Sequence, residues 1–144
     1  MLPADITIED LLPHREGMLL ITEVLRCDDQ GSAARCVVKK EWPLVDERGV
    51  SPIVLVELVA QTAAINNGLQ ILRKEGPGAD HRGWIVGIKS ARFHVDHLPL
   101  GTEIVVTSQN QFEFEGFREI GGTAEVDEQP AAEVVLQLMQ AKKE

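Results

Sequence analysis

Basic residues are scarce in this chain, which has 14 Lys and Arg against 23 Asp and Glu. The formal net charge is therefore −9 at pH 7, and such a charge opposes general attraction to nucleic acid or to an anionic membrane. No unbroken apolar run reaches the roughly 18 residues that a membrane-spanning helix requires. The first ten residues contain three acids and no basic cluster, so a secretory signal is not predicted. We expect a cytoplasmic protein that binds neither nucleic acid nor membrane.

Residue clusters typical of metal, redox or phosphate sites are also missing from the sequence. The two cysteines, Cys27 and Cys36, lack the spacing of a redox or zinc site and flank a turn, DDQGS. Without a secretory context we expect two free thiols. No group of His, Cys and acids has metal-ligand spacing, and no glycine-rich phosphate loop occurs. The sequence therefore predicts no metal and no other cofactor.

Length and composition indicate one domain over residues 1–144. The apolar fraction is 44% and the charged fraction 26%, which are ordinary values for a globular chain. No repeat, low-complexity segment or dividing linker is present.

The order of the predicted elements indicates an α+β fold. The pattern predicts a short helix over residues 6–13, capped by Thr7. It then predicts a hairpin of two strands over 18–27 and 32–41, followed by a loop over 41–50. Four further strands are predicted over 83–95, 102–116, 118–126 and 131–140. Six strands and one long helix result, and the helix must lie against the concave face of a curved antiparallel sheet to be covered.

The long helix has clear start and stop signals. Ser51 as the cap and Pro52 at the first helical position predict its beginning, and Gly76 its end, so we expect about 20–24 residues. Glu57 is the only side chain that can carry a charge at neutral pH between residues 52 and 72. A carboxylate among such apolar neighbours loses hydration, which costs several kcal/mol when burial is complete. We interpret Glu57 as a site residue; the alternatives are a side chain that points to water and a buried structural ion pair.

Three segments, in order along the chain, are similar to motifs of the hotdog-fold 3-hydroxyacyl-[acyl-carrier-protein] dehydratases. LLPHREGMLLITEVL resembles their Leu-Pro-His-Arg start, and SPIVLVELVAQTAA resembles their Pro-Gly-Val-Leu-x-x-Glu-x-x-Ala-Gln helix. GIKSARFHVDHLPLGTEIVV resembles their Arg-Phe strand and Pro-Gly turn. The similarity spans residues 10–140 and extends to the dehydratase-like proteins of aryl polyene gene clusters. It implies a hotdog fold, in which a six-stranded antiparallel sheet wraps a long central helix.

The resemblance also implies a reaction of fatty acid or polyene biosynthesis, in which a 3-hydroxyacyl thioester loses water. This chemistry needs a base, an acid and a donor that polarises the thioester carbonyl. The resemblance assigns the catalytic carboxylate to Glu57 and the carbonyl donors to backbone N–H groups around Pro52, Ile53 and Val54, at the positive end of the helix dipole. Gln61, four residues after Glu57, lies on the same helix face and is expected to orient it, or to form a satisfied amide at a dimer seam. Arg92 and Phe93 match the family's substrate-binding strand.

The chain departs from the family pattern at two positions. The usual catalytic His of a Gly-His-Phe-Pro loop would fall near Pro43, but no His lies between His14 and His81. Ile53 replaces the Gly after the helix-start Pro, and its side chain is expected to crowd the carbonyl pocket. Three alternatives follow: a replacement His reaches the site; Glu57 acts alone with a raised pKa, including as a thioesterase base; or the chain is a non-catalytic subunit of an active hotdog partner. The candidates for a replacement are His14, which we interpret as part of a structural motif, and His94 and His97.

An unpaired strand edge is expected in a hotdog protomer, so we predict a homodimer or a heterodimer with another hotdog protein. The substrate would be a thioester of acyl carrier protein or of coenzyme A. An acidic carrier would require a local basic patch, since the whole chain is negative. The candidates are Arg73, Lys74, His81, Arg82, Lys89 and Arg92; the alternative is ordinary solvated charge.

Overall fold

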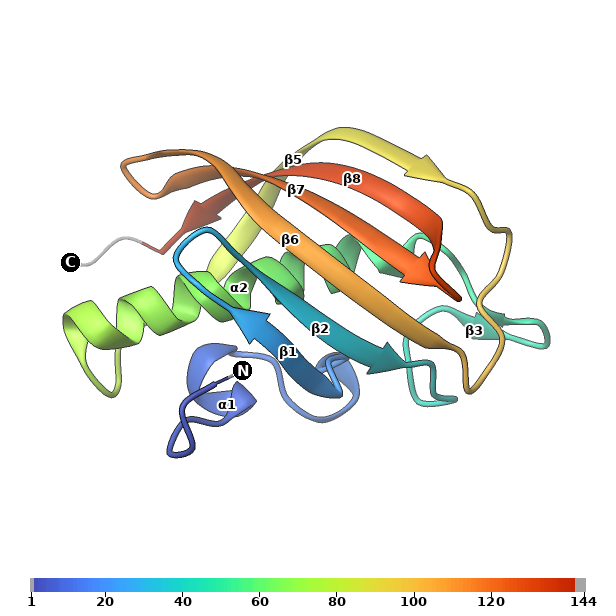
Figure 1. The fold of residues 1–144 in the computed structure, drawn as a ribbon, viewed down its shortest axis with the longest axis horizontal. Coiled ribbons are helices and arrows are strands. Elements are labelled where there is room, and N and C mark those ends of the chain that lie inside the picture. The colour runs from blue at the N-terminus through green and yellow to red at the C-terminus, as the bar shows by residue number, and fades with distance from the viewer. Residues whose placement is uncertain (1, 142–144) are drawn as a thin grey trace.

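The computed structural model describes residues 2–141, apart from the side chain of Glu16, and has the predicted α+β architecture (Figure 1). The N-terminal part contains α1 (Ile8–Leu11), a short 3-10 helix (Glu16–Met18), β1 (Glu23–Cys27), β2 (Gly31–Val37), β3 (Val45–Asp46) and β4 (Gly49–Val50). The long helix α2 (Val54–Glu75) follows, and then β5 (Gly83–Phe93), β6 (Glu103–Phe114), β7 (Phe117–Val126) and β8 (Gln129–Gln140).

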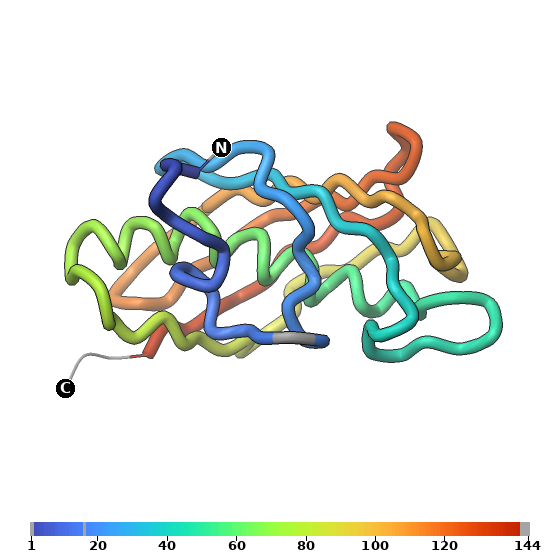
Figure 2. The backbone as a smooth tube through the Cα atoms, turned by 90° about the horizontal axis from the view of Figure 1, so that it is seen from below, coloured from blue at the N-terminus to red at the C-terminus, as the bar shows by residue number. Residues whose placement is uncertain are grey.

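Six of the strands form one antiparallel sheet in the order β1-β2-β6-β7-β8-β5. The sheet curves around α2, and the N-terminal segment crosses the face of the helix that the sheet leaves open (Figure 2). The two edges of the sheet are β1 and β5. This is the helix-in-sheet arrangement that the resemblance implies.

Helix α2 has 22 residues, within the predicted length, but it begins at Val54 rather than at Pro52. The Val54 N–H donates to the Ser51 carbonyl at 3.1 Å, and Ser51 Oγ accepts the Ile53 N–H at 3.4 Å. Residues 51–53 therefore form a tight turn ahead of the helix. The other end is as predicted, since Gly76 has a positive φ of 78° and its N–H donates to the Leu72 carbonyl at 2.8 Å, the arrangement that glycine favours after a helix.

The fold also differs from the prediction elsewhere: α1 covers only Ile8–Leu11 of the predicted residues 6–13, and β2 ends at Val37 rather than at residue 41. Residues 18–22, predicted as strand, lie outside β1 because Gln61 of α2 takes the Leu20 N–H, at 3.0 Å, away from strand pairing. Residues 41–50, predicted as a loop, contain the two-residue strands β3 and β4, which pair with each other.

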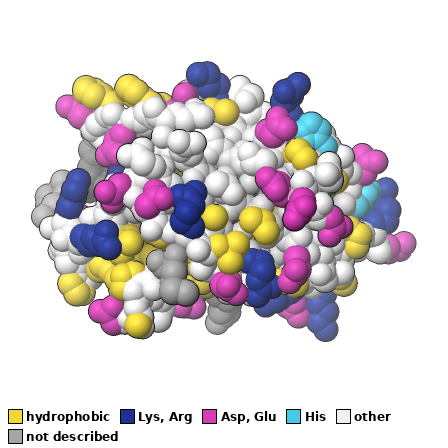
Figure 3. Space-filling view, viewed as in Figure 1, with side chains coloured by type: hydrophobic (Ala, Val, Ile, Leu, Met, Phe, Trp, Pro, Cys, Tyr) yellow, Lys and Arg dark blue, Asp and Glu magenta, His cyan; other side chains and the backbone are white. Residues whose placement is uncertain are grey.

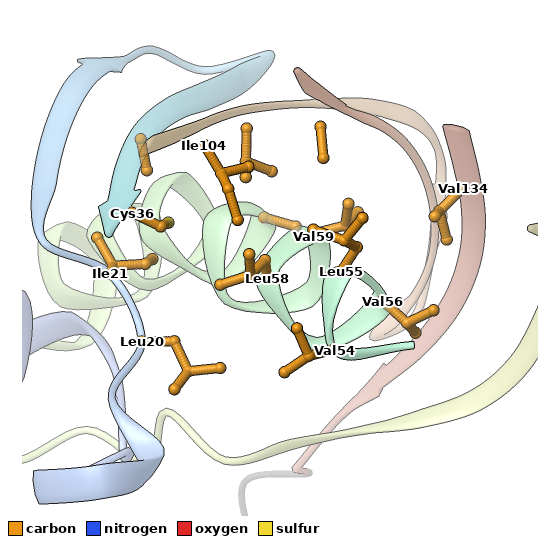
Figure 4. Close-up of a cluster of buried hydrophobic side chains, with 14 of the residues drawn as sticks. Leu20, Ile21, Cys36, Val54, Leu55, Val56, Leu58, Val59, Ile104 and Val134 are labelled. Atoms are coloured by element: carbon orange, nitrogen blue, oxygen red, sulfur yellow. The ribbon is translucent and has the colours of Figure 1, made fainter. Parts of the chain in front are cut away.

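The core lies between α2 and the concave face of the sheet (Figure 4). Leu55, Leu58 and Val59 are fully buried, and a Cβ at Gly122 of β7 would lie 2.3 Å from Val59 Cγ1. The helix is therefore packed so closely on β7 that only glycine fits there. Both cysteines are free thiols, as predicted, and burial raises the pKa of Cys36 to about 12.

Among the helices of residues 2–141, none combines the length and apolarity that crossing a membrane requires.

Candidate active site

The segment from Leu11 to Leu20 is fixed on α2 at two places. At the first, the backbone of Leu11 approaches Gly68 so closely that a Cβ there would lie 2.6 Å from the Leu11 carbonyl oxygen. At the second, Gln61 accepts the Leu20 N–H at 3.0 Å and donates from Nε2 to the Met18 carbonyl at 2.8 Å. Gln61 is fully buried, so these bonds also satisfy a polar group that would otherwise destabilise the core.

Arg15 braces the same segment from within. Its Nη1 donates to the carbonyls of Leu12, at 2.6 Å, and His14, at 2.7 Å, and its Nη2 donates to the Glu9 carbonyl at 3.0 Å. These carbonyls have no helical partner because α1 ends at Leu11. Arg15 thus gives the Leu-Pro-His-Arg motif a structural role, whereas His14, which we interpreted as structural, is the replacement candidate that reaches Glu57.

His14 lies beside Glu57, which no sequence spacing indicated. His14 Nε2 is 3.1 Å from Glu57 Oε1, and Gln61 Nε2 donates to the same oxygen at 3.1 Å. Within residues 2–141 no hydrogen bond reaches Glu57 Oε2. The side chains of His14 and Glu57 are 25% and 31% exposed. One carboxylate oxygen is therefore held by two donors, and the other is left for a ligand.

The pKa of Glu57 is lowered, which differs from the alternative in which Glu57 acts alone with a raised pKa. Partial burial acts to raise the pKa of Glu57, but the hydrogen bonds from His14 and Gln61 and the charge of His14 outweigh it. The pKa therefore lies below its ordinary value of 4.5, because donors to a carboxylate stabilise its charged form. Glu57 is therefore ionised at neutral pH.

An elongated cavity of about 320 Å³ begins at this pair. One wall is a single stripe of α2, and the opposite wall comes from the residues before and within β5 and from parts of β7 and β8. The stripe from Glu57 to Ile71 rises by about 21 Å at 1.5 Å per residue. It consists of Glu57, Ala60, Ala64, Asn67, Gly68 and Ile71. The small residues in its middle leave room for a narrow apolar ligand.

The structure does not bring the other predicted residues into this cavity. Pro52, Ile53 and Val54 lie in the turn before α2 and at its first residue, and they do not line the cavity. About half of the Ile53 side chain is exposed, so it does not crowd the site as expected. Arg92 and Phe93 lie at the far end of β5, where Arg92 is 3.9 Å from Glu133.

The other two candidate histidines also lie away from Glu57. His94 pairs with Glu133 at 3.3 Å, and neither His94 nor His97 lines the cavity.

The predicted basic patch is partly neutralised by nearby acids. Arg82 pairs with Asp80 at 2.8 Å, and Lys89 lies 3.4 Å from Glu119. Figure 3 shows Lys and Arg side chains interspersed with Asp and Glu over the face in view. His81 and Arg82 line the cavity, whereas Arg73 and Lys74 lie in the last turn of α2.

Two polar residues of the cavity were not singled out from the sequence. Arg118 of β7 is only 8% exposed, and Asn67 of α2 is buried; both line the cavity. Two sequence signals could have indicated them. Arg118 lies two residues before Ile120, on the same face of an alternating strand, and Asn67 is an amide in an apolar helix.

Replacing Gly68 with Ala should lower the free energy of unfolding by about 1–3 kcal/mol, because overpacking against Leu11 outweighs the gain in helix propensity. Urea unfolding measures the change. The matched control is Gly17→Ala, where the added Cβ would meet its nearest neighbour at 3.6 Å. Equal stability of Gly68→Ala and the wild type would contradict the close approach of Leu11.

Replacing His14 with Leu should raise the pKa of Glu57, since burial remains while a donor is lost. The wild-type pKa is below 4.5, so the ionised carboxylate favours folding above that pH, and this contribution disappears as pH falls through the folded-state pKa. Carbon NMR titration of the side-chain carboxyls measures both proteins. His94→Leu is the control, and it should leave Glu57 unchanged. An unaltered Glu57 titration in His14→Leu would refute the pairing.

Comparison with known proteins identifies the family. The family model ApeP-like, described as ApeP dehydratase, matches residues 6–144. A search of curated proteins gave no significant match.

Solved structures show the same fold at low sequence identity. A chain of the dehydratase heterocomplex ApeI:P from Xenorhabdus doucetiae superposes with a TM-score of 0.85 at 18% identity, covering 96% of this chain and 93% of that one. Cj0977, a sigma28-regulated virulence protein from Campylobacter jejuni, gives 0.69 at 17% identity over 94% and 96%. A hypothetical thioesterase with coenzyme A from Streptococcus pneumoniae TIGR4 gives 0.60 at 12% identity over 84% and 86%. With its helix wrapped by six antiparallel strands in the hotdog fold, the chain belongs to the ApeP-like dehydratase family.

Proposed function

We propose that this protein dehydrates 3-hydroxyacyl thioesters in fatty acid or polyene biosynthesis, with Glu57 as the catalytic carboxylate. The observation that carries the proposal is the His14–Glu57 contact of 3.1 Å at one end of an elongated cavity. An ionised carboxylate held by two donors suits proton abstraction from a carbon acid, and an apolar channel beside it suits an acyl chain.

The free oxygen of Glu57 performs both proton transfers in this proposal. Glu57 Oε2 takes a proton from C2 of the substrate, and the electrons of that C–H bond form the C2–C3 double bond. The C3–O bond breaks, and the hydroxyl leaves as water after receiving the proton from Glu57. His14 and Gln61 hold Oε1 throughout, so they position the carboxylate and stabilise its charge. The family's usual His is thereby replaced by a partner that orients Glu57 from within the same protomer.

The thioester carbonyl is assigned to the start of α2, where the helix dipole is positive. The Ile53 N–H is the better donor, since its bond to Ser51 Oγ is long at 3.4 Å. The Val54 N–H is already bound to the Ser51 carbonyl at 3.1 Å, and its release would require the turn to open.

We further propose that β5 pairs with a second hotdog chain. This edge strand exposes several large apolar side chains, namely Trp84, Ile85, Val86 and Ile88. An unpaired edge with an apolar surface is an association site. The similar structure from Xenorhabdus doucetiae is a heterocomplex, which supports a partner that is a different chain. His81 and Arg82, which line the cavity next to β5, are the proposed contacts for the carrier of the thioester.

Glu57→Gln should reduce kcat for dehydration of a 3-hydroxyacyl thioester by about 10²–10⁴-fold, the usual contribution of a general base. Formation of the conjugated enoyl thioester measures turnover, and release of free thiol separates dehydration from hydrolysis. The matched control is Glu103→Gln, which removes an exposed carboxylate on β6. Equal kcat in Glu57→Gln and the wild type would remove Glu57 from the chemistry, and thiol release would favour the thioesterase alternative.

Val86→Lys should weaken association through β5, because it places a charge on the apolar edge. Analytical ultracentrifugation of the protein alone, and with a co-expressed second hotdog chain, measures the assembly. Val105→Lys on β6 is the control, since Val105 is exposed within the sheet rather than at its edge. A dimer that survives Val86→Lys unchanged would place the interface elsewhere.

A further inference from the structure

Arg118 is a buried cation in the wall of the acyl cavity. It is 8% exposed, and it lies on the inward face of β7 together with Ile120 and Gly122, which packs on Val59 of α2. Burial of a guanidinium is costly unless its donors are satisfied. An acyl chain alone would need only an apolar wall. Arg118 therefore adds a charge that an acyl chain does not require.

The donors of Arg118 are incompletely satisfied. Its Nη2 lies 3.3 Å from Glu113 Oε1, and Glu113 is half exposed. Arg118 Nε is buried and has no hydrogen-bond partner within residues 2–141. A guanidinium has five N–H donors in a fixed plane and no acceptor. Arg118 lines the cavity, so an acceptor from a bound ligand would pair with the terminal N–H groups of the guanidinium that Glu113 does not bind.

Asn67 adds a second donor to the cavity. Its Oδ1 accepts from Asn66 Nδ2 at 3.4 Å and from Asn110 Nδ2 at 3.3 Å, which fixes the orientation of the amide. Its Nδ2 makes no hydrogen bond to another residue in the described part of the chain. Asn67 lines the same cavity as Arg118. Two buried residues thus offer donors there.

The distance from Glu57 sets the size of the ligand. Asn67 follows Glu57 by ten residues, a rise of about 15 Å along the helix. Between the two polar positions, the cavity is lined by Ala60 and Ala64 of α2. The order along the cavity is therefore the His14–Glu57 pair, an apolar stretch and a group of donors.

We propose that this cavity selects acyl chains that carry an anionic carboxylate at the end remote from the thioester. Such a terminus would accept hydrogen bonds from Arg118 and Asn67, and charge-assisted bonds of this kind are the strong ones. A methyl terminus would displace water and leave the terminal N–H groups of Arg118 without that partner. The assignment of the ligand as an acyl thioester rests on the proposed function.

The test is binding of two saturated acyl-coenzyme A thioesters of equal length, one ending in a carboxylate and one in a methyl group. Isothermal titration calorimetry should give at least about 10-fold tighter binding of the carboxylate ligand by the wild type, as expected for one charge-assisted bond. Arg118→Met should abolish this preference and Arg118→Lys should reduce it. Glu113→Gln should increase the preference, because it removes the acid that competes for Arg118. Arg48→Met, which removes an exposed charge in the β3–β4 loop, should change nothing.

Equal affinity of the wild type for both ligands, or binding of neither, would overturn the proposal. It would also be overturned if Arg118→Met weakened both ligands equally, since Arg118 would then contact the carrier arm common to both. If Arg118→Met does not fold, Glu113→Gln decides the outcome, because that side chain is half exposed. Saturated ligands have no 3-hydroxyl group to lose, so this preference is measured independently of turnover. A preference for the carboxylate ligand without dehydratase activity would overturn the proposed reaction but not the proposed selectivity.

Discussion

The hydrogen bonds of Gln61 hold the candidate site together. This one buried amide binds the backbone at Met18 and Leu20 and also reaches Glu57. It therefore couples the position of the N-terminal segment to the orientation of the carboxylate. Together with the Leu11–Gly68 approach and the His14–Glu57 contact, it fixes the loop that carries His14 on α2. The same bonds hold the backbone of Met18 and Leu20 on the helix, so these residues do not extend β1, which begins at Glu23.

The site depends on a balance between burial and hydrogen bonding at Glu57. An apolar helix alone would favour the neutral acid, but the two donors at Oε1 reverse that preference and keep the carboxylate charged. A proton accepted by such a group is readily given up again. This suits a reaction in which the same proton is first removed from carbon and then delivered to a leaving hydroxyl. The cavity adds an apolar wall beside the carboxylate, and Arg118 gives that wall a charged position.

The sequence predicts the fold well because its strongest patterns are local. Neighbouring residues alone are enough to predict the long apolar helix, the alternating strands β6 and β8, and the turns between them. Glu57 and Gln61 could be paired from their spacing of four on one helix face. His14 could not be placed in this way, because its approach to Glu57 depends on how the segment after α1 crosses α2. Arg118 was missed for a related reason. The register of β7 against α2 decides that this side chain faces a cavity rather than water, and the sequence does not give that register. The alternative in which Glu57 acts alone with a raised pKa considered burial without the donors that the fold supplies, and these donors lower the pKa.

The His14–Glu57 hydrogen bond is the central claim, and nitrogen NMR of the His14 imidazole tests it most directly. The account predicts that Nε2 carries a proton hydrogen-bonded to Glu57, with a downfield N–H signal that Glu57→Gln shifts and that His94→Leu leaves unchanged. A His14 imidazole whose Nε2 resonance is the same in the wild type and in Glu57→Gln would contradict the account.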